Sequence, residues 1–309
     1  MLIKRIFEIG VLTALSEPSA PPFDGAGSGT IVKPANDVFN RDLFGSILLP
    51  SREVKVWCPP GYDTSTQHYP VLYCHDGQNA MEDNTSWTGH SWRLGVALTR
   101  LLERGEIERP PIVVMIPNDS GGVAGLRRRH MEYGDSPWAH MYVDYVAKEL
   151  KPMIDSEFRT LSGPEHTSAM GTSLGGQASF LSLWRHPDVF GNVACLSPAF
   201  QGQLLADVAL NAQRLRDIYP TPRIYIDNGG DTEETTVPLF ALEDHLLNWN
   251  PGYWWLDTQL QPGVDLMCQL LDRHEVGYRF HKEAGGRHNE RAWSLRIEQP
   301  MLHLYGSKR

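Results

Sequence analysis

The sequence predicts an α/β fold in which a mostly parallel central sheet of about eight strands is covered by helices on both faces. Segments with the character of strands alternate along the chain with segments that place apolar residues at helical spacing, which is the order typical of a parallel sheet with crossover helices. Two segments, 69–75 and 111–117, are almost continuously apolar, as is typical of strands buried on both faces. A third, 167–170, leads through a glycine-rich turn into a helical pattern at 177–184.

The other expected elements complete this alternation. An edge strand is expected at 52–58, where polar and apolar residues alternate. Helices are expected near 92–102 and over 138–155, and the polar stretch 118–136 between them is interpreted as a surface loop. Three further strands are expected at 192–197, 223–227 and 278–282.

The first 50 residues differ in composition from the rest of the chain. Residues 17–37 are rich in proline, glycine, serine and alanine, which is typical of a loop or an arm. We therefore expect residues 1–50 to form an N-terminal arm or first strand, partly loop. Residues 51–309 contain no linker or internal repeat that would divide them, so we expect a single domain there.

Composition and charge argue against several classes of partner. The chain has 309 residues, of which 41% are hydrophobic, and a formal net charge of −9. This negative charge argues against a nucleic acid or an anionic membrane as partner, because either would require a basic surface. No apolar run is long enough to span a bilayer.

Cysteine usage favours the cytoplasm, with secretion as the alternative. The four cysteines are widely scattered and show no metal-binding spacing, so no metal site is expected. The first five residues resemble the charged start of a signal peptide, and Ser19–Ala20 resembles the end of a cleavage site. Glu8, however, interrupts the apolar stretch that a signal peptide requires between them.

Residues Gly171 to Gly175 read Gly-Thr-Ser-Leu-Gly and match the G-x-S-x-G pattern of a nucleophile elbow. In such an elbow Ser173 stands at the tip of a sharp strand-to-helix turn, and the flanking glycines allow one backbone to pack on the other. The N–H of Leu174 then lies at a helix N-terminus, where it can donate to an oxyanion. The alternative is an ordinary glycine-rich turn.

A nucleophilic serine requires a base and an acid, which follow it along the chain in the order acid, then histidine. The strand expected at 223–227 runs into a turn rich in carboxylates, from which we select Asp231, with Glu233 and Glu234 as alternatives. The strand expected at 278–282 runs into a glycine-rich loop that contains His288. The alternative for this histidine is a residue at the start of a helix.

The turn after the strand at 69–75 is the expected source of the second oxyanion donor. It reads Asp-Gly-Gln-Asn, and we expect the backbone N–H of Gln78 to be the donor. His75, at the end of the strand, is expected to line the substrate site. The alternative is an Asp-Gly turn that only reverses the chain.

Several longer motifs extend this pattern over residues 50–300: Tyr73–Asn79, Glu149–Asp155, Phe158–Thr160, Met170–Gly176, Arg185–Gly191, Leu196–Phe200 and Gly286–Asn289. In combination they resemble the putative-esterase group of α/β-hydrolases, which includes esterase D-like, feruloyl and enterochelin esterases. The resemblance implies the α/β-hydrolase fold and a serine carboxylic-ester hydrolase without a cofactor. It also implies catalytic roles for Ser173 and His288 and, less directly, for Asp231.

The interval between Asp231 and His288 is longer than that group usually has between acid and histidine. The excess is assigned to an insertion at 246–263 that is rich in tryptophan and tyrosine. We interpret it as a lid or an acyl- or aryl-binding wall, with Trp254 and Trp255 as candidate substrate contacts. The alternative is an apolar patch buried against the core or in a homodimer interface.

Taken together, these residues predict a serine esterase that forms an acyl-enzyme with a small-molecule or carbohydrate-linked ester. Acyl transfer to an alcohol or a sugar is the alternative within enzymes. A catalytically silent scaffold with the same fold is the alternative outside them.

Overall fold

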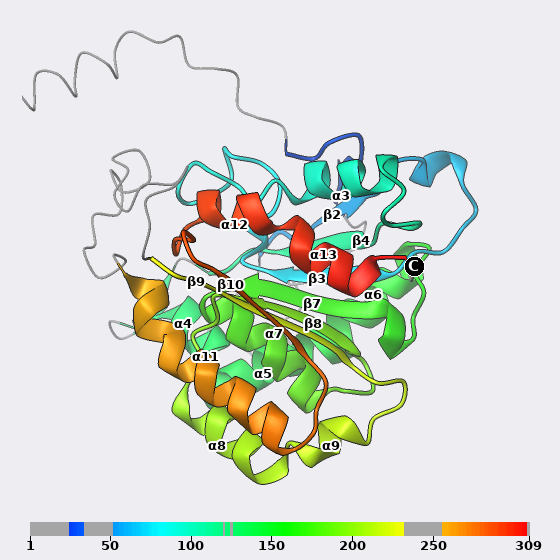
Figure 1. Cartoon of the computed structure of the whole chain (residues 1–309). Coiled ribbons are helices and arrows are strands. Elements are labelled where there is room, and N and C mark those ends of the chain that lie inside the picture. The colour runs from blue at the N-terminus through cyan, green and yellow to red at the C-terminus, as the bar shows by residue number, and fades with distance from the viewer. Residues whose placement is uncertain (1–24, 34–51, 120, 124–125, 232–254, 308–309) are drawn as a thin grey trace, which may run out of the picture.

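The structure is a computed structural model that describes residues 25–33, 52–119, 121–123, 126–231 and 255–307. Its centre is an eight-stranded sheet with the order β1-β2-β4-β3-β7-β8-β9-β10 (Figure 1). The strands are β1 (Thr30–Val32), β2 (Lys55–Cys58), β3 (Val71–His75), β4 (Ile112–Ile116), β7 (Thr167–Thr172), β8 (Asn192–Leu196), β9 (Arg223–Gly229) and β10 (Arg279–Glu283).

Only β2 runs in the opposite direction to the other strands of the sheet. β1 pairs antiparallel with β2 and β2 antiparallel with β4, whereas β4, β3, β7, β8, β9 and β10 are parallel. The predicted mostly parallel sheet is therefore confirmed. β1 lies inside the stretch interpreted as an arm or first strand, and the indole N–H of Trp57 in β2 donates to the carbonyl of Ala26 beside it, at 2.8 Å. Residues 1–24 and 34–51 lie outside the described residues.

Helices cover both faces of the sheet (Figure 1). One face carries α3 (Leu94–Glu103), α12 (Glu290–Arg296) and α13 (Glu298–Tyr305). The other carries α5 (Pro137–Tyr145), α6 (Lys151–Glu157), α7 (Leu174–Arg185), α8 (Gly202–Asn211), α9 (Gln213–Arg216) and α11 (Leu256–Arg273). Among the described residues no helix combines the length and apolarity needed to cross a bilayer.

Alternation along the central strands explains their continuous hydrophobicity. In β3, Val71 and Tyr73 join the core under α5 and α7, while Leu72 and Cys74 join the core under α3 and α13. All four side chains are fully buried, because successive residues of a strand point to opposite faces and both faces are covered.

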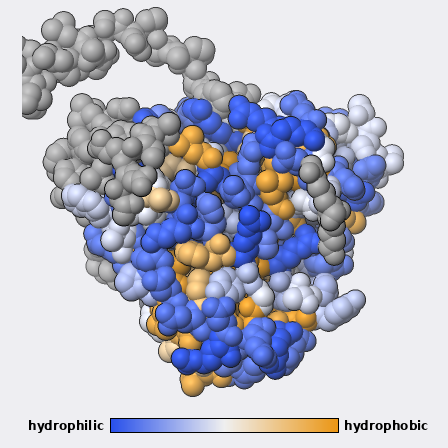
Figure 2. Space-filling view, viewed as in Figure 1, coloured by the Kyte–Doolittle hydropathy of each residue, from blue (hydrophilic) through white to orange (hydrophobic). Residues whose placement is uncertain are grey.

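The outer surface in Figure 2 is dominated by hydrophilic residues, with smaller hydrophobic areas between them.

The stretch 118–136, expected as a surface loop, is more ordered than predicted. It contains the short strands β5 (Gly122–Val123) and β6 (Leu126–Arg127) and the helix α4 (Arg128–Tyr133). Glu132 is buried because it forms an ion pair with Arg52, with an N–O distance of 2.8 Å. Residues with polar side chains are therefore held here by specific partners, which composition alone does not show.

The turn between β7 and α7 is a strained backbone with no space for side chains on its flanking glycines. Ser173 has φ 58° and ψ −124°, and its N–H donates to the carbonyl of Leu196 in β8, at 2.9 Å. A Cβ at Gly171 would lie 2.5 Å from the carbonyl carbon of Gly175. The two backbones can approach this closely only because Gly171 has no side chain, whereas a Cβ at Gly175 would lie 3.0 Å from Oδ2 of Asp76.

We expect Gly171→Ala to lower the free energy of unfolding by about 3 kcal/mol, because the methyl group meets backbone that cannot rotate away. Urea denaturation followed by circular dichroism measures this. Gly202→Ala is the matched control: it adds the same methyl group where nothing lies within 4 Å. Equal stability of the two variants would contradict the close backbone packing at the elbow.

Candidate active site

The parallel strands bring three polar side chains together at their carboxyl ends. Ser173 follows β7, and His288 lies in the loop between β10 and α12. Asp257 lies in the first turn of α11, the next described helix after β9. Residues far apart in the sequence meet here because the carboxyl ends of parallel strands share one edge of the sheet.

His288 and Asp257 form a buried hydrogen-bonded pair. Nδ1 of His288 lies 2.7 Å from Oδ1 of Asp257, and the two side chains are only 1% and 0% exposed. Burial acts to raise the pKa of Asp257, but the charge and hydrogen bond of His288, together with the cation of Arg296, outweigh it and hold the pKa below its usual value. The carboxylate is therefore ionised and able to orient the imidazole.

The sequence analysis selected Asp231 for this contact, and the structure places it elsewhere. Oδ2 of Asp231 accepts hydrogen bonds from the backbone N–H of Thr258, at 2.9 Å, and from its hydroxyl, at 3.3 Å. Asp231 thus satisfies a free N–H in the first turn of α11, next to Asp257. The alternatives Glu233 and Glu234 lie outside the described residues.

A sequence signal for Asp257 did exist. It precedes His288 by 31 residues, a much shorter interval than the one that began at Asp231 and had to be explained by an insertion. Residues 256–263 of that supposed insertion (246–263) are instead the start of α11, whose later residues, from Val264 on, pack on the core. Trp255 precedes this helix, is 48% exposed and is not among the residues that line the pocket described below, and Trp254 lies outside the described residues.

The two expected oxyanion donors occupy the expected kind of backbone. Leu174 is the first residue of α7, and Gln78 lies in a short 3₁₀ helix, η2 (Gly77–Asn79). The side-chain amide oxygen of Gln78 accepts from the backbone N–H of Asn118 at 3.0 Å, and the backbone carbonyl of Gln78 accepts from the hydroxyl of Thr85 at 2.7 Å. These contacts hold the segment after β3 in place beside Ser173.

His75 does not line the site. Its side chain is fully buried on the face of the sheet shared with Val71 and Tyr73, and its Nδ1 lies 2.8 Å from the hydroxyl of Tyr142. The ring also packs edge-on against Tyr133. Burial lowers the pKa of His75 to about 4, so the ring is neutral. The expectation was wrong because alternation along β3 directs this side chain away from the strand end and under α4 and α5.

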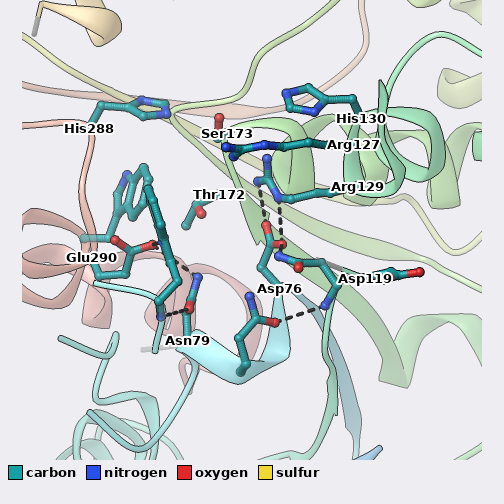
Figure 3. A pocket seen from close by; sticks show the side chains of 14 residues that line it. Asp76, Asn79, Asp119, Arg127, Arg129, His130, Thr172, Ser173, His288 and Glu290 are labelled. Carbon is teal, nitrogen blue, oxygen red and sulfur yellow. Dashed lines mark hydrogen bonds and ion pairs between the residues drawn. The ribbon is translucent and has the colours of Figure 1, made fainter. Parts of the chain in front are cut away.

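One pocket of about 360 Å³ opens at Ser173 (Figure 3). Ser173 and His288 both line it, as do Gln78 and the neighbouring Thr172. In Figure 3, Asn79 and Glu290 lie on one side of the pocket, and Asp119, Arg127, Arg129 and His130 lie on the other. The lining also includes Asp76, Trp87, Asn118 and Trp293. A serine, a histidine and one of the two oxyanion-donor candidates, Gln78, thus face a single cavity large enough for a small ester.

Glu290 connects the loop of His288 to the segment after β3. Its carboxylate accepts from the indole N–H of Trp87 at 2.7 Å, the amide of Asn79 at 3.2 Å and the hydroxyl of Thr88 at 3.2 Å. Burial raises the pKa of Glu290 to about 7. Because Glu290 is two residues from His288, these bonds connect the loop of His288 to the segment that follows β3.

A buried cation lies behind His288. The guanidinium of Arg296 donates to Asp227, at 3.2 and 3.3 Å, and to the hydroxyl of Ser197, at 2.8 Å. Ser197 also accepts from the indole N–H of Trp293, whose ring packs against His288 with centroids 5.0 Å apart. Arg296 therefore balances two buried carboxylates, Asp227 and Asp257. Sequence reasoning did not identify it, because nothing in a helix pattern marks an arginine as buried.

Comparisons with known proteins identify the family of the chain and its fold. Residues 46–303 match the family described as "Putative esterase". Among curated proteins, the uncharacterized protein YbbA of Bacillus subtilis is 21% identical over 150 residues, which are 48% of this chain and 58% of that protein. An endo-1,4-beta-xylanase/feruloyl esterase of Xylanibacter ruminicola is 30% identical over 151 residues, 46% of this chain and 19% of that protein. The matches thus span less than two thirds of these relatives.

Solved structures share the whole fold. A ferulic acid esterase superposes with a TM-score of 0.64 at 18% identity, covering 90% of this chain and 98% of that one. The enterochelin esterase of Shigella flexneri superposes with a TM-score of 0.58 at 16% identity, covering 94% of this chain and 59% of that one. At these identities the likeness shows the α/β-hydrolase fold.

The raised pKa of Glu290 predicts a pH-dependent stability. An acid whose folded-state pKa lies above its unfolded value contributes stability at low pH that is lost as the pH rises through the folded pKa, here about 7. We expect the free energy of unfolding of Glu290→Gln to fall less between about pH 5 and pH 8 than that of the wild type, by as much as about 3 kcal/mol. The glutamine amide can still accept from Trp87 and Asn79 and donate to Thr88.

Urea denaturation at several pH values measures this difference, and the comparison removes the contribution of all other titrating groups. Identical pH dependence in the two proteins would mean that Glu290 titrates in its ordinary range.

Proposed function

The chain belongs to the putative esterase family, and we propose that it hydrolyses carboxylic esters through an acyl-enzyme formed on Ser173. The observation that carries the proposal is the position of a strained, elbow-borne serine and a buried His288–Asp257 pair at one pocket. A serine hydroxyl is a poor nucleophile at neutral pH unless a base takes its proton and an acid orients that base.

Each residue of the proposed triad has one task. Oγ of Ser173 bonds to the ester carbonyl carbon while its proton passes to Nε2 of His288. Asp257 accepts from Nδ1–H, which selects the required tautomer and stabilises the imidazolium. The tetrahedral intermediate then expels the alcohol, which takes the proton from His288. Water attacks the acyl-enzyme with the same help from His288, and the carboxylic acid leaves as Ser173 regains its proton.

The negative charge that develops on the carbonyl oxygen requires donors already in place. We assign this role to the backbone N–H groups of Leu174 and Gln78, one at the N-terminus of α7 and the other in η2. A donor of this kind is typically worth about 3 to 4 kcal/mol of transition-state stabilisation. The close packing at the elbow and the hydrogen bonds of the Gln78 segment keep the two donors from moving.

Asp257 replaces Asp231 as our candidate for the triad acid. Asp257 lies in hydrogen-bond contact with His288, whereas the carboxylate of Asp231 is engaged by Thr258. The lowered pKa of Asp257 also matches the need for an ionised carboxylate. Asp231 then has a supporting role, in which it holds the first turn of α11 and so the position of Asp257.

The names of two similar proteins indicate which substrates to test first. One is a feruloyl esterase and the other an enterochelin esterase, so feruloyl and enterochelin esters are the first candidates within the class of small-molecule or carbohydrate-linked esters. Product analysis in the presence of added alcohols distinguishes hydrolysis from acyl transfer, since transfer would yield a new ester in place of the acid.

We expect Ser173→Ala to abolish the hydrolysis of p-nitrophenyl butyrate, because it removes the hydroxyl on which the acyl-enzyme forms. Intact-mass spectrometry after treatment with a fluorophosphonate is the complementary measurement, and it should show a single adduct on the wild type and none on the variant. Wild-type activity in Ser173→Ala would exclude the mechanism.

We expect Asp257→Asn to lower kcat by about 10⁴-fold, because an asparagine cannot hold the required tautomer of His288 or stabilise its charged form. Asp231→Asn is the matched control. Its amide oxygen can still accept from the N–H of Thr258, so kcat should change by less than about tenfold. If the two variants exchanged these effects, Asp231 would be the triad acid after all.

A further inference from the structure

The wall of the pocket opposite Glu290 carries positive charge. Arg127 comes from β6, and Arg129 and His130 come from α4, which follows it directly. All three line the same cavity as Ser173, and Figure 3 shows the side chain of Arg127 extending toward Ser173 across the mouth of the pocket. Two of the three, Arg127 and Arg129, are cations, in a chain whose net charge is −9.

Every carboxylate that lines the pocket already has partners. Asp76 accepts two hydrogen bonds from Arg129, at 2.8 and 2.7 Å, and a third from the amide of Asn118 at 2.5 Å. Asp119 forms an ion pair with Arg128 at 3.2 Å. On the far wall, Glu290 holds its own donors from Trp87, Asn79 and Thr88.

Two arginines line the pocket, and Arg129 is paired with Asp76, whereas Arg127 takes part in none of these pairs among the described residues. Its backbone is fixed by pairing with Gly122 in the β5–β6 hairpin, but within the described residues its guanidinium has no hydrogen bond or ion pair. His130 adds no positive charge to the pocket. Burial and the nearby charges of Arg129 and Arg127 lower the pKa of His130, so its ring is neutral at physiological pH.

We propose that Arg127 forms an anion subsite that binds a carboxylate of the substrate beside the scissile ester. The preferred substrate is then an acidic ester, such as the hemiester of a dicarboxylic acid or the ester of a hydroxy acid. A guanidinium suits this role because its fork of N–H groups matches a carboxylate and its charge does not depend on pH. In a chain of net negative charge, a local cation is also what offsets the repulsion of an anionic substrate.

Arg129 prepares the subsite without binding the anion itself. Its guanidinium is held by Asp76, which fixes α4 against the segment after β3. The ion pair between Arg128 and Asp119 connects the start of α4 to the segment that follows β4. Among the residues that the structure describes, the guanidinium of Arg127 thus has no partner, and because its backbone is supported, little ordering of the protein is needed when a carboxylate binds.

The proposal rests on the esterase activity proposed above and is tested with two matched pairs of esters. The first pair is mono-p-nitrophenyl adipate and its methyl ester, which differ by a carboxylate on the acyl side. The second is 4-carboxyphenyl butyrate and its methyl ester, which differ by a carboxylate on the alcohol side. For each pair, kcat/KM of the charged ester is divided by kcat/KM of the neutral one.

We expect Arg127→Gln to lower this ratio by about tenfold or more in at least one pair, since a hydrogen bond to a charged group is lost. Arg127→Lys should retain part of the preference, because it keeps the charge without the bidentate geometry. Raising the salt concentration should reduce the wild-type ratio, because ions screen the attraction. The pair that responds also identifies which side of the ester carries the acid.

Arg104→Gln is the control, because it removes one positive charge from an arginine that, like its partners Glu106 and Glu298, does not line the pocket. Its ratio should equal that of the wild type. If Arg127→Gln matches the wild type in both pairs, the subsite is excluded while the esterase stands. If the wild type cleaves none of the esters, the esterase proposal fails instead, and equilibrium binding of adipate to Ser173→Ala with and without Arg127→Gln still tests the subsite.

Discussion

The buried hydrogen bond between His288 and Asp257 is the contact on which the rest of the site depends. Asp257 could not be buried as a carboxylate without such a partner, because an isolated charge in a low-dielectric interior costs several kcal/mol. The surrounding structure is arranged to support the pair. Asp231 holds the first turn of α11, the helix that carries Asp257. Gly229, at the end of β9, leaves space for the carboxylate of Asp257. A Cβ on this glycine would lie 1.9 Å from Oδ2 of Asp257.

Charge compensation extends from this pair in two directions. Behind it, Arg296 is shared by Asp227 and Asp257, so that one buried cation stabilises two buried anions. In front of it, the pocket has the opposite balance. There the carboxylates are satisfied by Arg128, Arg129 or neutral donors, and Arg127 is left facing the cavity. The interior is thus arranged to keep Asp257 ionised, and the cavity is arranged to receive negative charge from outside.

Local sequence patterns predicted those parts of the protein that short stretches of chain control. The continuous apolar runs of β3 and β4 identified central strands because both faces of the sheet are covered. The elbow was predictable because the conformation of Ser173 and the approach of Gly171 to Gly175 are properties of five consecutive residues. His288 was found because its loop follows a strand and precedes a helix. The expectation for His75 failed where it depended on which face of the sheet a strand end presents.

The sequence by itself determined that this is a mostly parallel α/β protein with a sharp strand-to-helix turn at Ser173 and a histidine on a later loop. Only the tertiary structure decided that Asp257, and not Asp231, contacts the histidine, because that choice depends on where α11 begins relative to the sheet. The same is true of Arg296 and Arg127, one buried among carboxylates and the other facing the pocket. A charged side chain carries no mark of its environment in the sequence, since its burial and its partners are set by segments distant along the chain.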